Sequence, residues 1–291
     1  MRKKILVVGA NGMLGGSIFR YFSSNDAYDV IGTVRSENAK ELLISQGFTN
    51  IISDVDVNNF ENLNTVIIGY NPDYIFNCVG IIKQLDSSKV PVMTIEINSV
   101  LPHKLANTAS SIDAKLIHFS TDCVFSGSVG GYNESVIPDA TDLYGRSKLL
   151  GEVDYCGHIT LRTSIIGHET NKGVSLVDWF LSQNGEVSGY KNAIFSGMPT
   201  CYLAQMIDKI ILPNSNLTGL YHFSVDPIDK YTLLTLIKDI YQKEIFIKEN
   251  LEFKIDRSLD SSLLKNITNF KPLPWPELIK KMHHEYISYF K

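Results

Sequence analysis

The first 170 residues alternate between short apolar runs and longer amphipathic runs, and this alternation limits the fold more than any other feature. The apolar runs predict six strands, at residues 4–10, 28–35, 50–55, 73–80, 115–125 and 158–166. The stretches between them predict helices, at residues 13–22, 39–46, 58–68, 91–110 and 142–153. Near-continuous apolar strands separated by helices are typical of a parallel sheet that is covered on both faces. We therefore expect an α/β fold with a doubly wound parallel sheet.

From residue 168 onward the alternation stops. The elements that we expect there are a hairpin at 185–198, a strand at 219–225 and helices at 201–212, 231–241 and 277–289. No Gly/Ser linker, repeat or low-complexity tract separates the two parts of the chain. The sequence therefore predicts a main domain at residues 1–167 and a smaller mixed region at residues 168–291, in which part of the chain returns to the main domain.

Charge and cysteine content exclude several classes of protein. The chain has 27 basic and 31 acidic residues, so its net charge does not favour binding to nucleic acid or anionic lipid. None of the four cysteines forms a CxxC pair, which favours reduced thiols. The apolar run after Lys4 has four residues, whereas the core of a signal peptide needs about 7–15. We therefore expect a cytoplasmic protein that binds neither nucleic acid nor a membrane.

The first predicted strand runs directly into a glycine-rich turn at residues 9–15. Gly9 allows a tight turn out of the strand, Gly12 leaves room for a phosphate, and Gly15 lets the following helix lie close to the sheet. The backbone N–H groups at the start of that helix then face an anion. A strand before the turn and a helix after it are the context that dinucleotide binding requires, and a turn without a ligand is the alternative. The residues that we expect to hold NAD(P) here are Gly9, Asn11, Gly12, Met13, Leu14 and Gly15.

The ends of the next three strands predict the rest of the dinucleotide site. An acid that binds the ribose 2′-OH of NAD is missing after the second strand, where Arg35 and Ser36 suit the 2′-phosphate of NADP instead. This favours NADPH, with NADH still possible. Asp54 and Val55 end the third strand and are expected at the adenine, although Asp54 is equally suited to cap a helix. The small residues at the end of the fourth strand leave room for the ribose and nicotinamide, and they are Cys78, Val79 and Gly80.

Three residues further along the chain suggest catalysis. Tyr144 and Lys148 are four apart on a predicted helix, so they point from one face. A nearby ammonium favours the phenolate, and this prepares Tyr144 to exchange a proton near neutral pH. Thr121 lies near the carboxyl end of the fifth strand, where its hydroxyl could bind a substrate oxygen. Such a Tyr–Lys pair is usually only a surface pair, but the order of glycine turn, Thr121 and Tyr-x-x-x-Lys favours a reductase site.

At this point the sequence resembles a family, the extended short-chain dehydrogenase/reductases, and within it the dTDP-4-dehydrorhamnose reductase (RmlD-type) branch. The residues that carry the resemblance are 11–15, 118–127, 144–152 and 161–164, with Lys271-Pro272-Leu273-Pro274-Trp275 near the end. The resemblance is strongest up to residue 167.

The resemblance implies a Rossmann domain followed by a smaller nucleotide-sugar-binding region. It implies reduction by NADPH of the 4-keto group of a nucleotide-linked 6-deoxy-4-keto sugar, in deoxysugar and cell-surface polysaccharide biosynthesis. Tyr144 would donate the proton, with Lys148 and Thr121 assisting. Asn98 matches an asparagine that is usually structural or relays protons in the family, and we place it among the cofactor-binding candidates. No metal-ligand pattern is present, and a homodimer is among the possible assemblies.

Two departures from the family leave the sugar open. Cys123 stands where relatives often have tyrosine, and Ile165-Ile166-Gly167 lack the usual aromatic residues. A nucleotide-sugar epimerase or dehydratase is one alternative, although the missing acid after the second strand argues against the tightly bound NAD of those enzymes. A non-catalytic, NADP-binding regulatory subunit is the other, and the intact Thr121, Tyr144 and Lys148 argue against it.

Overall fold

The computed structural model describes residues 2–82, 90–170 and 175–291, which form two compact units that interleave along the chain. The first unit comprises Met1–Ser120, Thr141–Leu161 and Asn214–Leu220. The second unit comprises Thr121–Ala140, Arg162–Pro213 and Tyr221–Lys291.

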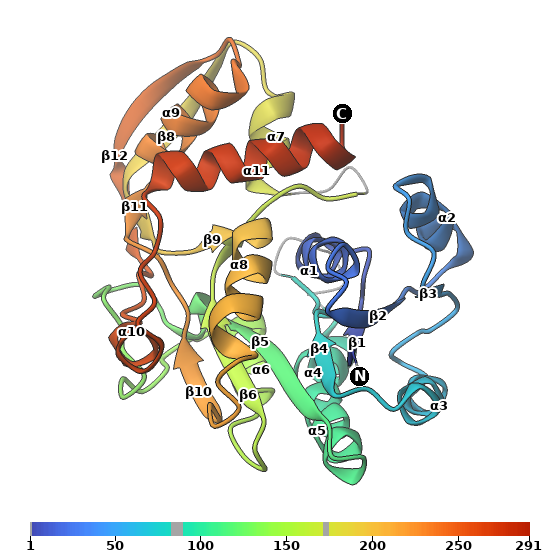
Figure 1. Ribbon diagram of the computed structural model, residues 1–291. Helices are drawn as coiled ribbons and strands as arrows, with labels where there is room; N and C mark the ends of the chain where they lie inside the picture. The colour runs from blue at the N-terminus through green and yellow to red at the C-terminus, as the bar shows by residue number, and fades with distance from the viewer. Residues whose placement is uncertain (1, 83–89, 171–174) are drawn as a thin grey trace. The chain divides into compact units, whose positions relative to one another are not determined.

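The sheet that begins in the first unit has seven strands in the order β10-β6-β5-β4-β1-β2-β3 (Figure 1). Strand β1 pairs in parallel with β2 and β4, β2 with β3, and β4 with β5. This order, which reverses at β1, is that of a doubly wound Rossmann sheet and confirms the predicted fold class. The strands are β1 Lys3–Val8, β2 Tyr28–Thr33, β3 Ile51–Ile52, β4 Tyr74–Asn77, β5 Lys115–Thr121, β6 Ile159–Thr163 and β10 Gly219–His222.

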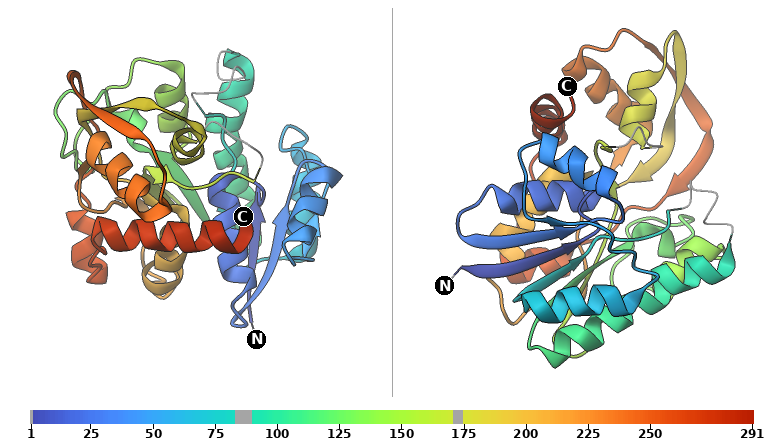
Figure 2. Two further views of the ribbon diagram at one scale, coloured as in Figure 1. Left: turned by 90° about the horizontal axis from the view of Figure 1, so that it is seen from above. Right: turned by 90° about the vertical axis from the view of Figure 1, so that its right-hand side faces the viewer.

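Helices cover both faces of this sheet. Figure 2 shows α1 on one face and α3 and α5 on the other. Alternate residues of β1 serve the two sides, because successive side chains of a strand point to opposite faces. Leu6 and Val8 pack in one core cluster with residues of α3 and α5, whereas Phe22 of α1 stacks on Phe76 of β4 with a centroid separation of 5.5 Å. The helical segments are α1 Met13–Ser23, α2 Glu37–Ser45, α3 Phe60–Tyr70, α4 Pro91–Ile95, a π-helix at Glu96–Val100, α5 Leu101–Ser111 and α6 Leu143–Leu150.

Two predicted elements of the first half differ in the structure. The long helix expected at residues 91–110 contains a π-helical turn at Glu96–Val100, a local widening of a kind that is common at functional sites. The strand expected at residues 115–125 ends at Thr121, because the Thr121 hydroxyl accepts a hydrogen bond from the Cys123 N–H and starts a 3₁₀ turn at Asp122–Val124.

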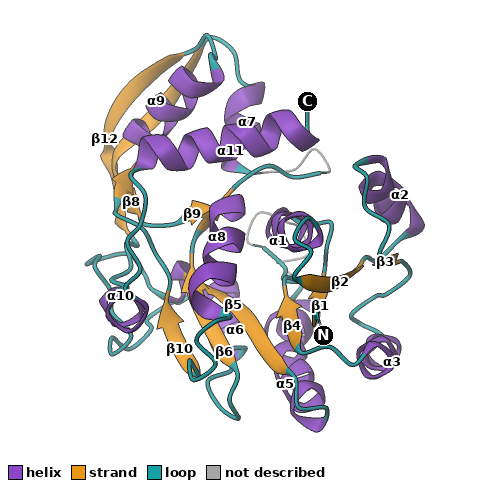
Figure 3. Ribbon diagram, in the orientation of Figure 1, coloured by secondary structure: helices purple, strands orange, loops and turns teal. Residues whose placement is uncertain are grey.

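The second unit has its own small sheet, in the order β11-β8-β12. Strand β8 is central, with β12 parallel to it and β11 antiparallel. Figure 3 shows β8 and β12 as two long neighbouring strands with α9 beside them. The segments of this unit are β7 Ile165–Ile166, α7 Leu176–Ser182, β8 Glu186–Phe195, β9 Met198–Pro199, α8 Thr200–Met206, a π-helix at Ile207–Ile211, β11 Ile228–Asp229, α9 Lys230–Tyr241, β12 Phe246–Asp256, α10 Ser262–Thr268 and α11 Trp275–Tyr289.

The hairpin expected at residues 185–198 is wrong. Residues 186–195 form one continuous strand, β8, whose partners come from much later in the chain. Gly189 lies where α9 packs closely on β8: a Cβ at this position would be 2.8 Å from the Tyr231 ring. Across the described segments, no helix is both long and apolar enough to cross a membrane.

Candidate active site

The glycine turn lies at the carboxyl ends of three neighbouring strands of the first unit. The Gly9 and Ala10 N–H groups both donate to the Thr33 carbonyl at the end of β2, at 3.2 and 2.9 Å. The Cys78 N–H, just after β4, donates to the Val8 carbonyl at 3.1 Å. These bonds bring the turn beside the ends of β2 and β4. In open α/β sheets, ligands bind outside this edge, at the point where the strand order reverses.

Steric constraints explain why two of the three positions in this turn are glycine. Gly9 has a φ of +85°, a conformation that side chains rarely adopt. A Cβ on Gly15 would be 2.1 Å from the Gly9 carbonyl oxygen, so only glycine lets α1 start this close to the turn. Around Gly12 a Cβ would meet only the Gly9 oxygen, at 3.7 Å, which leaves this side of the turn open.

The start of α1 suits the pyrophosphate of a dinucleotide. Its N-cap residue is Gly12, and no side chain caps this end of the helix. The N–H groups of the first turn of a helix have no partner within the helix, and together with the helix dipole they bind anions. The open space beside Gly12, which a Cβ would fill, and the uncapped start of α1 suit a bound dinucleotide. When bound, the dinucleotide would supply the hydride.

The loop after β2 carries the two residues that the sequence predicts for a 2′-phosphate, Arg35 and Ser36. Arg35 is exposed and makes no hydrogen bond or ion pair with any described residue. Ser36 is the N-cap of α2, where its hydroxyl accepts from the Ala39 N–H at 3.4 Å. The nearby acid, Glu37, forms an ion pair with Lys40 at 3.1 Å, which occupies its charge.

The candidate residues after β3 and β4 differ in their exposure to solvent. Asp54 is exposed and does not cap α3, because Asn59 does so. The Val55 side chain is buried in the core cluster, so only its backbone can face a ligand. Gly80 is exposed, whereas Val79 packs on the glycine turn at Gly9. Burial raises the pKa of the Cys78 thiol, which is therefore neutral near pH 7.

Asn98 joins the end of β4 to the helix that carries Tyr144. Its side chain accepts from the Ile81 N–H at 2.9 Å and donates to the Ile81 carbonyl at 3.0 Å and to the Ser147 hydroxyl at 3.1 Å. Its own carbonyl approaches Gly151 so closely that a Cβ there would be 1.9 Å away. Asn98, on the π-helical turn, thus connects the segment after β4 to α6 through its hydrogen bonds and stabilises the position of α6.

Helix α6 begins immediately before Tyr144. Asp142 is its N-cap and accepts a hydrogen bond from the Gly145 N–H at 3.0 Å. Tyr144 is half-buried in the first turn, and Lys148 is 6% exposed one turn later. The Lys148 ammonium donates to the Phe119 carbonyl on β5 at 2.6 Å. This contact identifies Lys148 as a buried, fixed side chain, in contrast to the surface pair that was the alternative.

The charge of Lys148 is set by two opposing effects. Burial lowers its pKa to about 8, and the nearby Glu152 carboxylate, followed by Cys78, opposes that shift. The ammonium therefore stays mostly protonated at pH 7 but titrates much closer to neutrality than a surface lysine does.

Thr121 ends β5 and begins the second unit. Its hydroxyl is already engaged, because it donates to the Asp122 carboxylate at 3.1 Å while it accepts from the Cys123 N–H. Burial raises the pKa of Asp122, and Arg257 is the strongest influence that lowers it. To donate to a substrate, Thr121 would have to turn its hydrogen away from Asp122.

Two cations beside this segment were not singled out from the sequence. Arg257 donates to the Phe125 carbonyl at 3.0 Å and to the Ser126 carbonyl at 3.4 Å, just after the 3₁₀ turn. Lys230, at the start of α9, is half-buried, which lowers its pKa, while Asp122 opposes this shift. Neither lies in a recognised motif, so only the folded chain reveals that they face Thr121-Asp122-Cys123.

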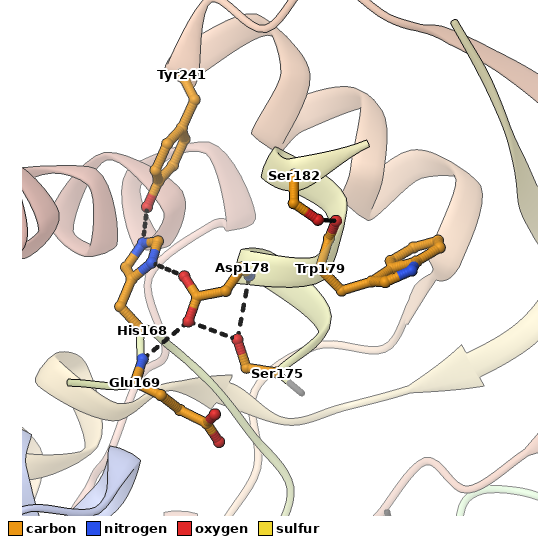
Figure 4. Close-up of polar contacts among 7 residues, drawn as sticks. All are labelled: His168, Glu169, Ser175, Asp178, Trp179, Ser182 and Tyr241. Carbon is orange, nitrogen blue, oxygen red and sulfur yellow. Dashed lines mark hydrogen bonds and ion pairs between the residues drawn. The ribbon is translucent and has the colours of Figure 1, made fainter. Parts of the chain in front are cut away.

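A separate polar cluster of the second unit centres on His168, and Figure 4 shows it. His168 is 1% exposed; its Nδ1 is 2.5 Å from an Asp178 carboxylate oxygen and its Nε2 is 2.8 Å from the Tyr241 hydroxyl. The other Asp178 oxygen accepts from the Glu169 N–H and the Ser175 hydroxyl, both at 2.9 Å. Trp179, on the same helix, points away from this cluster (Figure 4) and is 42% exposed. The cluster connects α7 to α9 and to the segment that follows β7.

Comparisons with known families and solved structures show which family the chain belongs to. The RmlD substrate binding domain family matches residues 2–246. The chain belongs to this family. A dTDP-4-dehydrorhamnose reductase of Bacillus anthracis, solved in complex with NADP, has the same fold, with a TM-score of 0.80 and 21% identity over 98% of this chain and 100% of that one.

Curated relatives of this family member carry different names. A probable low-salt glycan biosynthesis reductase of Haloferax volcanii is 31% identical over half of this chain. A dTDP-4-dehydrorhamnose reductase of Aggregatibacter actinomycetemcomitans is 26% identical over 77% of it and 74% of that protein. Methionine adenosyltransferase 2 subunit beta of Bos taurus is 27% identical over 52% of this chain. The match spans only 46% of the Haloferax protein and 42% of the bovine one.

Proposed function

We propose that this RmlD-family chain uses NADPH to reduce the 4-keto group of a nucleotide-linked 6-deoxy-4-keto sugar. The observation that carries the proposal is Lys148, buried one helical turn from Tyr144 and held by the Phe119 carbonyl. A lysine in this position has no use as a surface charge, but it suits a tyrosine that must exchange a proton. The similarity to a protein named dTDP-4-dehydrorhamnose reductase supports the substrate class.

Each residue then has a defined task. Tyr144 gives its phenolic proton to the oxygen that becomes the alcohol, as the hydride reaches the carbon. The Lys148 ammonium favours the phenolate that remains on Tyr144, because an adjacent opposite charge stabilises an anion. Lys148 is also the residue that we propose to hold the nicotinamide ribose. Thr121 would bind the keto oxygen through its hydroxyl, which requires the exchange of its bond to Asp122 described above.

NADPH is the proposed cofactor because of the loop after β2. Arg35 is exposed and uncommitted to any described residue, and Glu37 is paired with Lys40. A free guanidinium binds a phosphate through charge-assisted hydrogen bonds. The structural relative that was solved with NADP is consistent with this choice.

The second unit is proposed to bind the nucleotide part of the substrate. Arg257 and Lys230 bring two cations to the segment that follows Thr121. A nucleoside diphosphate carries negative charge that such cations stabilise. The two cations therefore support a nucleotide sugar as the class of substrate, and they do not specify its base or its sugar.

One observation favours a second candidate function. The bovine relative is named as the beta subunit of methionine adenosyltransferase 2, and it matches half of this chain. A regulatory subunit that binds NADP would keep the glycine turn without a need for proton transfer. The buried Lys148 argues for catalysis, so the activity of a Tyr144 variant separates the two candidates.

The proposal predicts that Tyr144→Phe cuts the rate of NADPH oxidation with a 4-keto nucleotide sugar by about 10²-fold or more, because the proton donor is gone. NADPH binding, measured by the fluorescence of the reduced cofactor, should remain near that of the wild type. Tyr155→Phe is the matched control, since it removes a phenol hydroxyl that contacts His103 on the exposed side of α5. Equal turnover in the two variants would remove Tyr144 from the mechanism.

A further inference from the structure

Two successive residues of strand β5 form hydrogen bonds, one with helix α6 and one with the segment that follows α6. The Phe119 carbonyl accepts a hydrogen bond from Lys148 at 2.6 Å. The next residue, Ser120, donates its hydroxyl to the Glu152 carboxylate, also at 2.6 Å. Lys148 and Glu152 are four residues apart, so a cation and an anion are fixed on adjacent points of one strand.

The position of Glu152 is fixed from other directions too. Helix α6 ends at Leu150, and the Glu152 N–H donates to the Leu149 carbonyl at 3.2 Å. The following residue, Val153, exchanges two hydrogen bonds of 2.8 Å with the Thr160 hydroxyl on β6. Ser120 itself is 5% exposed. A carboxylate held in this way is not a mobile surface charge.

We propose that Glu152, anchored by Ser120, is a positioning residue for Lys148: it keeps that side chain charged and in place against the Phe119 carbonyl. This inference rests on the proposed function for its effect on turnover. A buried ammonium is disfavoured unless an opposite charge lies close to it. Among the described residues, Cys78 and His118 also interact electrostatically with Lys148, and neither supplies an opposite charge at pH 7.

Two described groups from neighbouring strands of the sheet interact electrostatically with Lys148. Cys78, after β4, is neutral near pH 7 because burial raises its pKa. His118 on β5 is fully buried, which lowers its pKa well below the usual value and keeps it neutral as well. Glu152 is therefore the described carboxylate that can stabilise the Lys148 ammonium.

The first test is a direct titration of Lys148 in the protein without cofactor. The Cε resonance of Lys148 in ¹³C-lysine-labelled protein is assigned by its loss in Lys148→Arg, and its midpoint in the wild type should lie at about pH 8. Glu152→Gln keeps an acceptor for Ser120 but removes the charge, and should lower the midpoint by about one pH unit. Glu61→Gln, which removes an exposed carboxylate of α3, is the control and should change nothing. An unchanged midpoint in Glu152→Gln overturns the proposal.

The second test is the pH profile of turnover with NADPH and a reducible keto sugar. Because the lysine of Glu152→Gln loses its proton at lower pH, the alkaline limb of kcat/KM should move down by about one pH unit, while rates near pH 6 stay within about 2-fold of wild type. Ser120→Ala keeps the charge, so its limb should stay while its kcat falls. A uniform loss at every pH in Glu152→Gln would show a merely structural role. If the wild type turns over no keto sugar, the proposed function fails, whereas the titration still decides the role of Glu152.

Discussion

At the scale of single residues, burial decides what the polar side chains of this chain can do. Lys148 and His118 are both buried, yet one keeps a charge beside Glu152 and the other stays neutral with its Nδ1 3.1 Å from the Asn77 side-chain nitrogen. Sequence alone predicted Tyr144 and Lys148 as a candidate pair from their spacing, because helical spacing is a local property. It could not identify Arg257 or Lys230, since their approach to the segment after Thr121 depends on how distant parts of the chain fold.

Gly15→Ala tests the steric basis of the glycine turn. The added Cβ would lie 2.1 Å from the Gly9 carbonyl oxygen, so the turn or α1 must move. We expect unfolding in urea to show a loss of about 1–3 kcal/mol, and NADPH to bind at least about 10-fold more weakly. The matched control is Gly69→Ala in α3, where a Cβ would meet nothing within 4 Å, and it should be neutral or slightly stabilising. Tight NADPH binding by Gly15→Ala would refute the assignment of this turn.

At the scale of elements, the first half was predictable because its strands are apolar and buried on both faces. The predicted strands at residues 4–10 and 28–35 correspond to β1 and β2, each with two residues too many at its end. The second unit was harder to predict, because its central strand β8 is completed by β12, whose alternation of charged and apolar residues is that of an exposed edge. Local patterns carry no information about a partner some sixty residues away.

Gly189→Ala distinguishes a packed strand from the hairpin that the sequence suggested. In β8 the new Cβ would be 2.8 Å from both the Ile247 side chain and the Tyr231 ring. We expect a loss of about 1–3 kcal/mol in the free energy of unfolding, because α9 must move away from the sheet. Ser188→Ala, at an exposed neighbouring position of the same strand, should cost less than about 0.5 kcal/mol. Equal stability of the two variants would mean that α9 does not pack on Gly189.

At the scale of the whole molecule, the proposed tasks are divided between the two units. The dinucleotide candidates, Tyr144 and Lys148 belong to the first unit, whereas Thr121 and the two cations near it belong to the second. Motifs predict the first group as candidates, because a glycine turn and a helical pair are contiguous in sequence. We expect the residues that choose the sugar to come from the part of the chain where the resemblance to relatives is weakest, so neither the base nor the sugar follows from the motifs.

Cofactor preference is a property of the folded molecule and is read from its melting temperature. A ligand that binds the native state raises that temperature in proportion to the logarithm of its concentration over its Kd. We expect NADPH at about 100 times its Kd to stabilise the protein by about 2.7 kcal/mol, and NADH at the same concentration to stabilise it clearly less. Arg35→Ala should reduce the difference between the two cofactors. Equal shifts in the wild type would contradict the role given to Arg35.

The most direct test of the central claim is the oxidation of NADPH, followed at 340 nm, with a panel of dTDP-, UDP-, GDP- and CDP-linked 6-deoxy-4-keto sugars. The account predicts oxidation with one member of the panel, one alcohol formed at C4 per NADPH consumed, and loss of the reaction in Tyr144→Phe. A wild-type protein that binds NADPH but oxidises it with no member of the panel would contradict the reductase assignment and favour a regulatory subunit.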